Sequence, residues 1–107
     1  MVLVQNTIRH TFYKGEAAVC LGETYDKDDA LCTPSRSIKI RIKDTNGTRQ
    51  VEDADMTAEA VGKYKYTYPI AANAATGAWT FEVITTDGED EEVSISSGSF
   101  IVQGRVA

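Results

Sequence analysis

The only imidazole in this 107-residue sequence belongs to His10, and imidazole is the side chain that most often serves as a general base in catalytic sites. A nucleophile needs such a base within hydrogen-bond reach and a third group that orients it. His10 alternates with Ile8 and Phe12, which is typical of a strand position that packs inward or lies at an edge. The sequence has no Gly-x-Ser-x-Gly motif and no phosphate-binding loop. We therefore predict that the protein is not an enzyme and has no catalytic or cofactor-binding residue.

Metal binding is the stronger chemical candidate, because acidic side chains gather in two short stretches. The first stretch contains Glu23, Asp26, Asp28 and Asp29. The second contains Glu52, Asp53 and Asp55. Oxygen ligands crowded into one loop suit calcium, but the first stretch lacks the spacing and the glycine of an EF-hand loop. Acidic loops on β-sandwiches are usually just solvated, so we predict no metal ligand and leave calcium at residues 23–29 open.

Two cysteines, Cys20 and Cys32, are too few for a four-ligand zinc site. A disulfide between them would close a short loop and add about 3 kcal/mol of stability. The alternative is two unpaired thiols, one buried in a strand and one in a loop. The cellular compartment decides between these states, and the sequence leaves the choice open.

Composition excludes two classes of partner. Lys and Arg total 11 and Asp and Glu total 16, giving a net charge of −5, so the chain repels phosphate backbones and we expect no nucleic acid. No apolar run approaches the roughly 20 residues of a membrane helix, so we expect no membrane insertion. The length fits one domain. We predict a single domain over residues 1–107, with its core at about 7–103 and a terminal arm on either side.

Apolar and polar residues alternate along most of the chain, which is the pattern of half-buried β-strands. In residues 37–44 one face would carry Ile38, Ile40 and Ile42. Around residues 63–70 and 78–86 the apolar face is aromatic and would carry Tyr64, Tyr66, Tyr68 and Trp79. The opposite faces carry lysine, threonine and glutamate, which are costly to bury. We therefore expect the aromatic stripe in the core rather than on a sugar-binding surface.

Weaker alternation covers the remaining segments. Residues 7–13 would form one strand, and in residues 16–23 the apolar face would carry Ala17, Val19 and Leu21. From residue 93 to 102 the apolar positions change from odd to even numbers, which indicates a bulge or break at 96–99. Residues 51–62 suggest a connection with at most one helical turn.

Turn residues separate these segments. Asn46-Gly47-Thr48 matches the glycosylation pattern, but Asn-Gly between two strands is also a strong hairpin signal, and we prefer the hairpin. The acidic run at 87–92 fits a solvated loop tip. Six or seven strands with one polar face each predict an all-β, two-layer antiparallel sandwich.

The order of the segments FYKGE, SIKIRIKDTNGT, VGKYKYTYPI, TGAWTFEVITTDG and SGSFIVQ resembles that of immunoglobulin-like sandwich modules of about seven strands. The likeness is to fibronectin III or macroglobulin-type and bacterial surface modules, and to short structural proteins of tailed phages and proviruses. It covers about residues 7–103, with Gly62-x-Tyr64-x-Tyr66 and Gly77-Ala78-Trp79 as its most specific parts. No cysteine lies on a late strand, so the inter-sheet disulfide of antibody domains is absent.

The resemblance implies a non-enzymatic structural module whose partners are other proteins, such as neighbouring subunits of an assembly. Our first hypothesis is a virion component of a tailed phage or provirus, in the head decoration, the head–tail connector or the tail. The ends MVLVQN and QGRVA would then be contact arms that add strands to neighbouring sheets. The alternative is an extracellular adhesion module at a cell surface, which predicts a Cys20–Cys32 disulfide and calcium at residues 23–29. A third hypothesis is a carbohydrate-binding module with an exposed aromatic patch.

Overall fold

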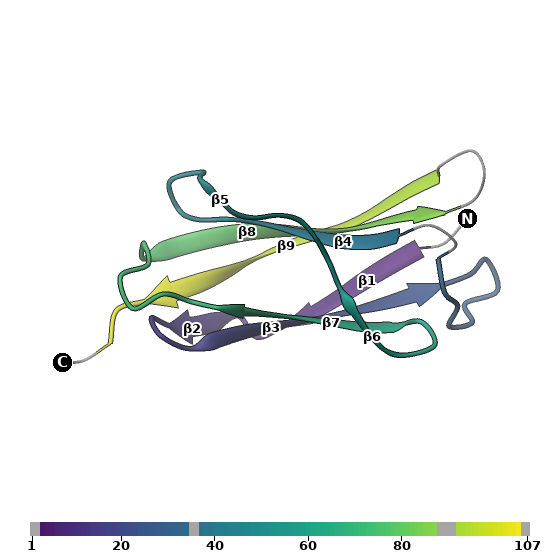
Figure 1. Cartoon of the computed structure of the whole chain (residues 1–107), viewed down its shortest axis with the longest axis horizontal. Helices are drawn as coiled ribbons and strands as arrows, with labels where there is room; N and C mark the ends of the chain where they lie inside the picture. The colour runs from purple at the N-terminus through teal and green to yellow at the C-terminus, as the bar shows by residue number, and fades with distance from the viewer. Residues whose placement is uncertain (1–2, 35–36, 88–91, 106–107) are drawn as a thin grey trace.

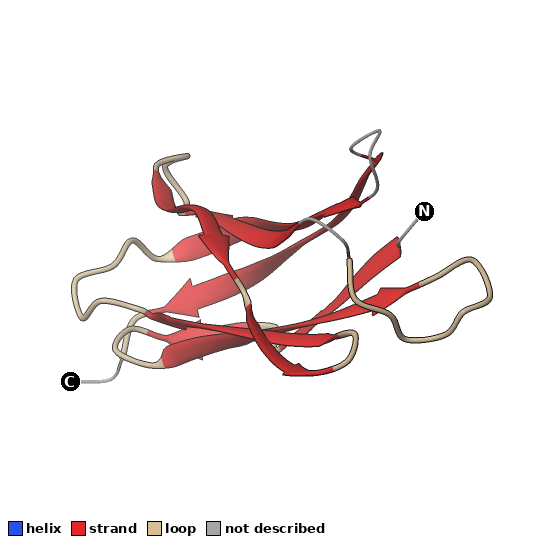
Figure 2. Cartoon of the chain, turned by 45° about the vertical axis from the view of Figure 1, so that its right-hand side comes forward, coloured by secondary structure: helices blue, strands red, loops and turns tan. Residues whose placement is uncertain are grey.

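The computed structural model describes residues 3–34, 37–87 and 92–105, which form nine β-strands in two sheets. One sheet has the order β1 (Leu3–Ile8), β3 (Ala17–Tyr25), β7 (Lys63–Pro69), β6 (Thr57–Ala60). The other has the order β2 (Thr11–Tyr13), β9 (Glu92–Gln103), β8 (Gly77–Asp87), β4 (Ser37–Lys43), β5 (Arg49–Asp55). All pairs are antiparallel except β2 with β9. The sheets form two layers (Figure 1, Figure 2), which confirms the predicted all-β sandwich. The described residues include no helix that could cross a membrane.

Aromatic rings fill the space between the sheets, as the alternation predicts. Trp79 is 1% exposed, and its indole N–H donates to the carbonyl of Ala75 at 2.9 Å. The Phe100 ring packs against Trp79 at 5.9 Å between centroids and edge-on against Phe12 at 5.4 Å. Tyr64 is buried, and Tyr66 and Tyr68 pack against the core. The indole hydrogen bond is satisfied inside the protein, so burial of the ring leaves no polar atom unpaired.

The strand count exceeds the predicted six or seven because residues 7–13, expected as one strand, belong to two, and residues 51–62, expected as a connection, belong to two more. Residues 7–13 are not one strand: β1 ends at Ile8 in one sheet and β2 begins at Thr11 in the other. His10, between them, is exposed, and its carbonyl accepts the N–H of Ile101 at 2.8 Å. Residues 51–62 contain no helical turn. They complete β5 and form β6, and the buried Met56 lies where the chain crosses between sheets.

The N-terminal segment is also different from our expectation of a free arm. From Leu3 onward it forms β1, which pairs along its whole length with β3, so these residues already have a sheet partner within the chain. At the other end Gln103 is the last residue of β9, and Gly104 and Arg105 follow it as exposed residues. The sandwich therefore begins at Leu3 rather than at residue 7.

Two strands present the opposite face to the core from the one we predicted. In β3 the buried side chains are Ala18, Cys20 and Thr24, while Val19 and Leu21 are exposed. β9 pairs with β8 without a register shift from residue 92 to 102, so the expected bulge is absent. Its even-numbered residues from 94 to 102 face inward, and Val93 and Ile95 are 51% and 56% exposed.

Two inward-facing serines of β9, Ser94 and Ser96, form hydrogen bonds to β1 and so stabilise this orientation of β9. The Oγ of Ser94 accepts the N–H of Val4 at 3.3 Å, and the Oγ of Ser96 accepts the side-chain amide of Asn6 at 2.5 Å. Both serines therefore face β1, which lies in the opposite sheet. Small polar side chains let the two sheets approach closely here, whereas valine or isoleucine would hold them apart and leave the N–H of Val4 unpaired.

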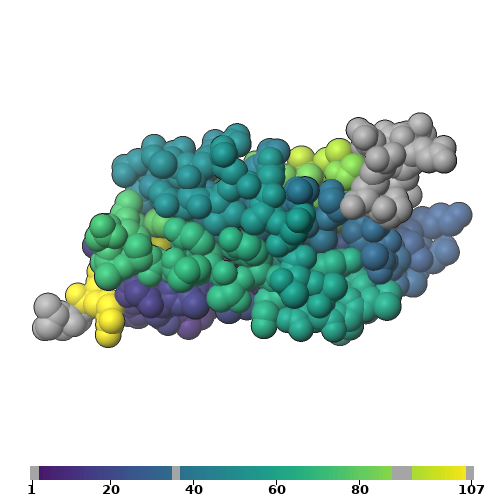
Figure 3. Space-filling model, viewed as in Figure 1, coloured from purple at the N-terminus to yellow at the C-terminus, as the bar shows by residue number. Residues whose placement is uncertain are grey.

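The molecule is elongated, with extents of 49 × 23 × 17 Å (Figure 3). Two ends can be distinguished in Figure 1. The C-terminal end contains the β2–β3 turn at residues 14–16, the β4–β5 turn at 44–48 and Arg105. The N-terminal end contains Leu3, the loop after β3 and the β6–β7 turn. Of the acidic run predicted at 87–92, Asp87 ends β8 and Glu92 begins β9, and residues 88–91 lie outside the described part of the chain.

Candidate functional site

The first acidic stretch does not converge on a metal site. A carboxylate oxygen of Asp26 accepts the N–H groups of Asp28 at 2.8 Å and Ala30 at 3.1 Å, so this side chain is used to shape its own loop. Glu23 accepts the hydroxyl of Tyr25 at 3.1 Å. Asp28 and Asp29 are exposed. Within residues 3–34, 37–87 and 92–105, no three His, Cys, Asp or Glu side chains are placed to hold a metal ion.

The second acidic stretch is engaged in ion pairs on the outer face of the five-stranded sheet. The pairs are Arg49–Glu52, Arg41–Asp53 and Lys39–Asp55. The Arg41 guanidinium lowers the pKa of the Asp53 carboxyl by a direct hydrogen bond. The register between β4 and β5 shifts near Arg41, and Asp53 has a φ of 48°. These carboxylates balance the basic face of β4, so they are not available as a calcium site.

The two cysteines are both free thiols, which confirms the unpaired alternative. The N–H of Cys32 donates to the carbonyl of Thr24 at 3.0 Å, which places Cys32 beside Thr24. Thr24 lies four residues along β3 from Cys20, a distance of about 13 Å, whereas a disulfide needs Cα atoms within about 7 Å. Burial raises the pKa of Cys20 to about 11, so its thiol is unreactive near neutral pH.

The Asn46-Gly47-Thr48 sequence forms the β4–β5 turn, as preferred. A carboxylate oxygen of Asp44 accepts the N–H groups of Asn46 at 2.9 Å and Thr48 at 3.0 Å. Gly47 has a φ of 80°, a left-handed conformation that glycine adopts without steric cost. The turn therefore explains these residues without a glycan.

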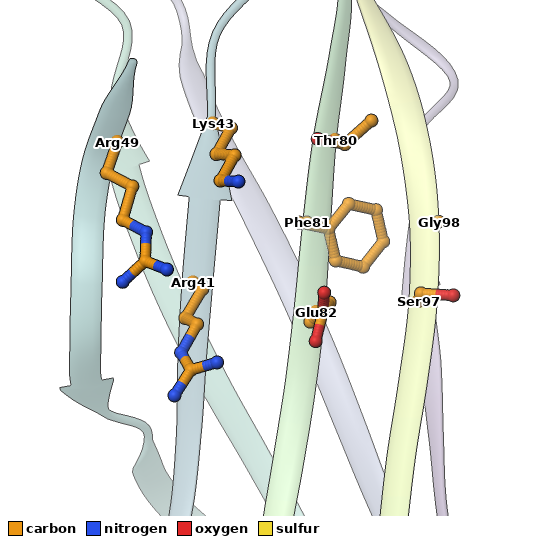
Figure 4. A pocket seen from close by; sticks show the side chains of 8 residues that line it. All are labelled: Arg41, Lys43, Arg49, Thr80, Phe81, Glu82, Ser97 and Gly98. Carbon is orange, nitrogen blue, oxygen red and sulfur yellow. The ribbon is translucent and has the colours of Figure 1, made fainter. Parts of the chain in front are cut away.

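A shallow depression of about 350 Å³ lies on the outer face of the five-stranded sheet (Figure 4). Its basic side chains are Arg41, Lys43 and Arg49. Two of these three are already paired with Asp53 and Glu52. Glu82, which also lines the depression, lies opposite Arg41 in the β4–β8 register. The positive charge of this surface is therefore largely compensated from within the chain.

A second groove, of about 680 Å³, lies at the C-terminal end and is lined by Arg9, Thr11, Tyr13, Gly15, Glu16 and Arg105. We call it the C-terminal groove. The Arg9 Nε donates to the carbonyl of Thr11 at 2.8 Å, and the guanidinium lies over the Phe12 ring at 4.5 Å from its centroid. Arg9 also binds Glu16 at 2.7 Å. The sheet change between β1 and β2 thus holds Arg9 in a fixed orientation at the groove.

The C-terminal groove already binds one carboxylate, that of Glu16. One oxygen pairs with Arg9 and the other accepts the N–H of Tyr13 at 2.7 Å, and both contacts lower the pKa of Glu16. Arg105 and Lys14 line an adjoining hollow. Neither of them forms an ion pair with any described residue. The C-terminal groove and the adjoining hollow together therefore carry three basic side chains against a single acidic one, and Tyr13 adds a ring that is 46% exposed.

Comparisons with known proteins support the fold. No protein-family model matches the sequence, and no curated protein is similar to it. The structure resembles a tetra-tandem repeat in the extending region of a large adhesion protein, with a TM-score of 0.71 and 18% identity over 96% of this chain. It also resembles a DUF4785 family protein from Legionella pneumophila, with a TM-score of 0.64 and 12% identity over 92% of this chain. The chain spans 24% and 27% of these two structures.

The M1 domain from titin is similar over 100% of this chain and 99% of that domain, with a TM-score of 0.53 and 17% identity. Together these likenesses show an immunoglobulin-like β-sandwich, the predicted fold class. Identities of this size show the fold alone. None of these three structures is a phage protein.

Sequence reasoning did not identify the C-terminal groove. Arg9 and Arg105 lie near opposite ends of the sequence, and only the parallel pairing of β2 with β9 brings them to one surface. No local motif marks such a pair. The isolated arginine after the last apolar strand was the one available signal, and it is indistinguishable from an ordinary solvated residue.

Proposed function

We propose that the protein is a non-enzymatic interaction module of an extracellular or cell-surface adhesion protein. The observation that carries this proposal is the placement of the start of β1 and the end of β9 at opposite ends of a sandwich 49 Å long (Figure 1). A module of this shape extends a chain by its full length when units are joined in series. The likeness to repeats in the extending region of an adhesion protein supports the same role.

The adhesion role does not depend on the two features that we first attached to it. We expected a Cys20–Cys32 disulfide and calcium at residues 23–29, but the cysteines are free and the described carboxylates of that loop do not converge. A sandwich of this size can be stable through its hydrophobic core alone. A surface module without a disulfide is therefore consistent with the fold.

The virion role predicted from the sequence ranks second. An immunoglobulin-like sandwich suits this role, but the N-terminal contact arm that it predicted is not free, because residues from Leu3 onward are paired with β3. The carbohydrate-binding role ranks third. The aromatic stripe on which it depended packs against the core, with Trp79 1% exposed.

Sequencing the DNA on both sides of the reading frame tests the proposal. Further sandwich units in the same frame, with a secretion signal ahead of them, are the expected result. Genes for a portal, capsid or tail protein on either side would overturn it in favour of the virion role. Labelling of intact cells and of purified particles with an antibody against the folded protein provides an independent readout. Label confined to particles would likewise overturn the proposal in favour of the virion role.

A further inference from the structure

Charge is unevenly distributed along the long axis of the molecule. At the N-terminal end the loop at residues 26–30 carries Asp26, Asp28 and Asp29 and one basic residue, Lys27. At the C-terminal end the groove and its adjoining hollow carry Arg9, Lys14 and Arg105 and one acidic residue, Glu16. The loop is therefore net negative and the groove with its adjoining hollow is net positive, and they lie at opposite ends of a 49 Å axis.

We propose that the protein binds a second copy of itself end to end, with the C-terminal groove of one copy receiving the Asp26–Asp29 loop of the next. This inference rests on the proposed function in one respect, since it names the partner of a module that works in series. The partner is a second copy because each molecule carries both halves of the contact. The two halves differ in chemistry and point in opposite directions.

The groove is suited to carboxylates because it already holds one. Glu16 uses only the guanidinium of Arg9 and the N–H of Tyr13, and the side chains of Lys14 and Arg105 are left without an ion-pair partner among the described residues. An arginine presents several N–H groups in a planar fork that matches a carboxylate. Two further carboxylates can therefore be bound beside Glu16 without displacing it.

The loop is suited to present carboxylates because its backbone is held from within. Asp26 accepts the N–H groups of Asp28 and Ala30, and the N–H of Asp29 donates to the carbonyl of Asp26 at 3.1 Å. The side chains of Asp28 and Asp29 point outward and are exposed. Because the loop is already ordered by these bonds, docking it costs less conformational entropy than ordering a flexible loop.

A contact between two different surfaces does not close on itself, so it produces a linear array rather than a two-fold dimer. Arg105 of one copy would lie against the end of the next copy that contains Leu3. The chain direction therefore continues from copy to copy, as it does in modules joined in series.

Sedimentation velocity of the intact protein over a range of concentrations, at about 0.01 M and about 1 M salt, tests the inference. The Debye length falls from about 30 Å to about 3 Å between these conditions. We expect weak, concentration-dependent association at low salt and a monomer at high salt. The double variant Lys14→Gln with Arg105→Gln should weaken association about tenfold. Its matched control, Thr7→Glu with Thr67→Glu, changes the net charge by the same amount on the outer face of the four-stranded sheet and should not.

A charge exchange makes the test specific to the two surfaces. Lys14→Glu with Arg105→Glu gives a molecule with two acidic ends, and Asp28→Lys with Asp29→Asn gives one with two basic ends. Asparagine is used at position 29 because φ is 61° there, and asparagine tolerates this conformation. Each variant should be monomeric alone, and an equimolar mixture should associate. Every variant is first checked for the wild-type unfolding transition.

Three results would overturn the inference: a wild-type monomer at low salt up to millimolar concentration, association that high salt leaves unchanged, or variants that associate alone and not on mixing. These results leave the proposed function intact, because an adhesion module can bind other proteins. Conversely, flanking virion genes would overturn the proposed function. Sedimentation velocity would then still decide whether the protein associates end to end.

Discussion

Replacing Gly98 by alanine should destabilise the protein, because the Phe81 ring occupies the space above this glycine. The two residues are direct partners across β8 and β9. A Cβ atom at position 98 would lie 2.8 Å from Cζ of Phe81 and 3.0 Å from its Cε1. Carbon atoms in favourable contact are about 3.5–4.0 Å apart. Phe81 is 2% exposed and packs against Phe100 at 6.2 Å between centroids, so its ring has little room to move away.

The magnitude follows from two opposing effects. Forcing an extra methyl group into a packed core costs about 1–3 kcal/mol. Replacing glycine by alanine also lowers the entropy of the unfolded chain, which stabilises the folded state by about 0.4–1 kcal/mol. We expect a net loss of about 1–2 kcal/mol in the free energy of unfolding. For a chain of this size the loss corresponds to a melting temperature lower by about 5–15 °C.

Urea unfolding followed by the fluorescence of Trp79 measures this loss, since Trp79 is the only tryptophan and is buried in the folded state. Gly104→Ala is the matched control, because a Cβ there would meet nothing within 4 Å. The double variant Phe81→Leu with Gly98→Ala should be less destabilised than the sum of the two single variants by at least about 0.5 kcal/mol. Strict additivity, or a Gly98→Ala protein as stable as the wild type, would refute the proposed collision.

Three further outcomes are expected. Gly62→Ala should lower the free energy of unfolding by at least about 2 kcal/mol in the same urea assay. Gly62 has a φ of 72°, and a Cβ there would lie 2.9 Å from the backbone nitrogen of Cys32. A smaller loss would mean that the loop after β3 can shift. An aromatic disulfide reagent should titrate Cys32 in the folded protein and Cys20 only after unfolding, because Cys20 is 2% exposed; a Cys32→Ser protein that still reacts rapidly would contradict this. Glu16→Gln should flatten the acid limb of the stability curve. The pKa of Glu16 is below its ordinary value of 4.5 in the folded state, so below that value the unfolded chain binds more protons, and stability is lost as pH falls through the folded pKa. A wild-type acid limb in Glu16→Gln would show that the Arg9 contact is not formed in solution.

The strands with one clearly polar face could be predicted from the sequence. In β4 and β8 lysine, arginine, threonine or glutamate mark the outer face, so only one orientation avoids burying charge. The aromatic core follows directly from this rule, because Trp79 and Phe81 share the other face of β8. Hydrophobic alternation is a strong guide wherever the cost of the wrong register is large.

β3 and β9 could not be oriented in this way, for two different reasons. In β3 the inward Ala18 and Cys20 and the outward Val19 and Leu21 are all apolar, so no charge distinguishes the faces. In β9 the outward residues are more apolar than the inward Ser94 and Ser96. Those serines face inward because β1 supplies hydrogen bonds to them. A contact between residues 90 positions apart decides the orientation, and no local pattern contains that information.

The two points where the chain changes sheets could not be predicted from the sequence for a related reason. Residues 9–10 lie within a run whose alternation is continuous. Residues 51–62, which cross between the sheets at Met56, have no apolar stripe that marks either strand. The chain needs only one or two residues to cross between sheets. The C-terminal groove exists because of the first crossing. It turns Arg9 onto the Phe12 ring and toward Glu16, at the surface that Arg105 reaches from the end of β9. The failure to predict the crossing and the failure to predict the groove therefore have one cause.

The distribution of ion pairs explains why charge remains at the ends of the molecule rather than on its faces. Across the five-stranded sheet, Lys39, Arg41 and Arg49 each lie beside a carboxylate of β5, and Lys65 pairs with Glu59 on the four-stranded sheet. Exposed pairs of this kind contribute only about 0–1 kcal/mol each to stability. Their larger consequence is electrostatic: a face whose charges cancel neither attracts nor repels a neighbour at a distance. Among the described residues, the loop at 26–30 carries a net negative charge and the C-terminal groove with its adjoining hollow a net positive one, so long-range attraction between copies would favour contact through the ends.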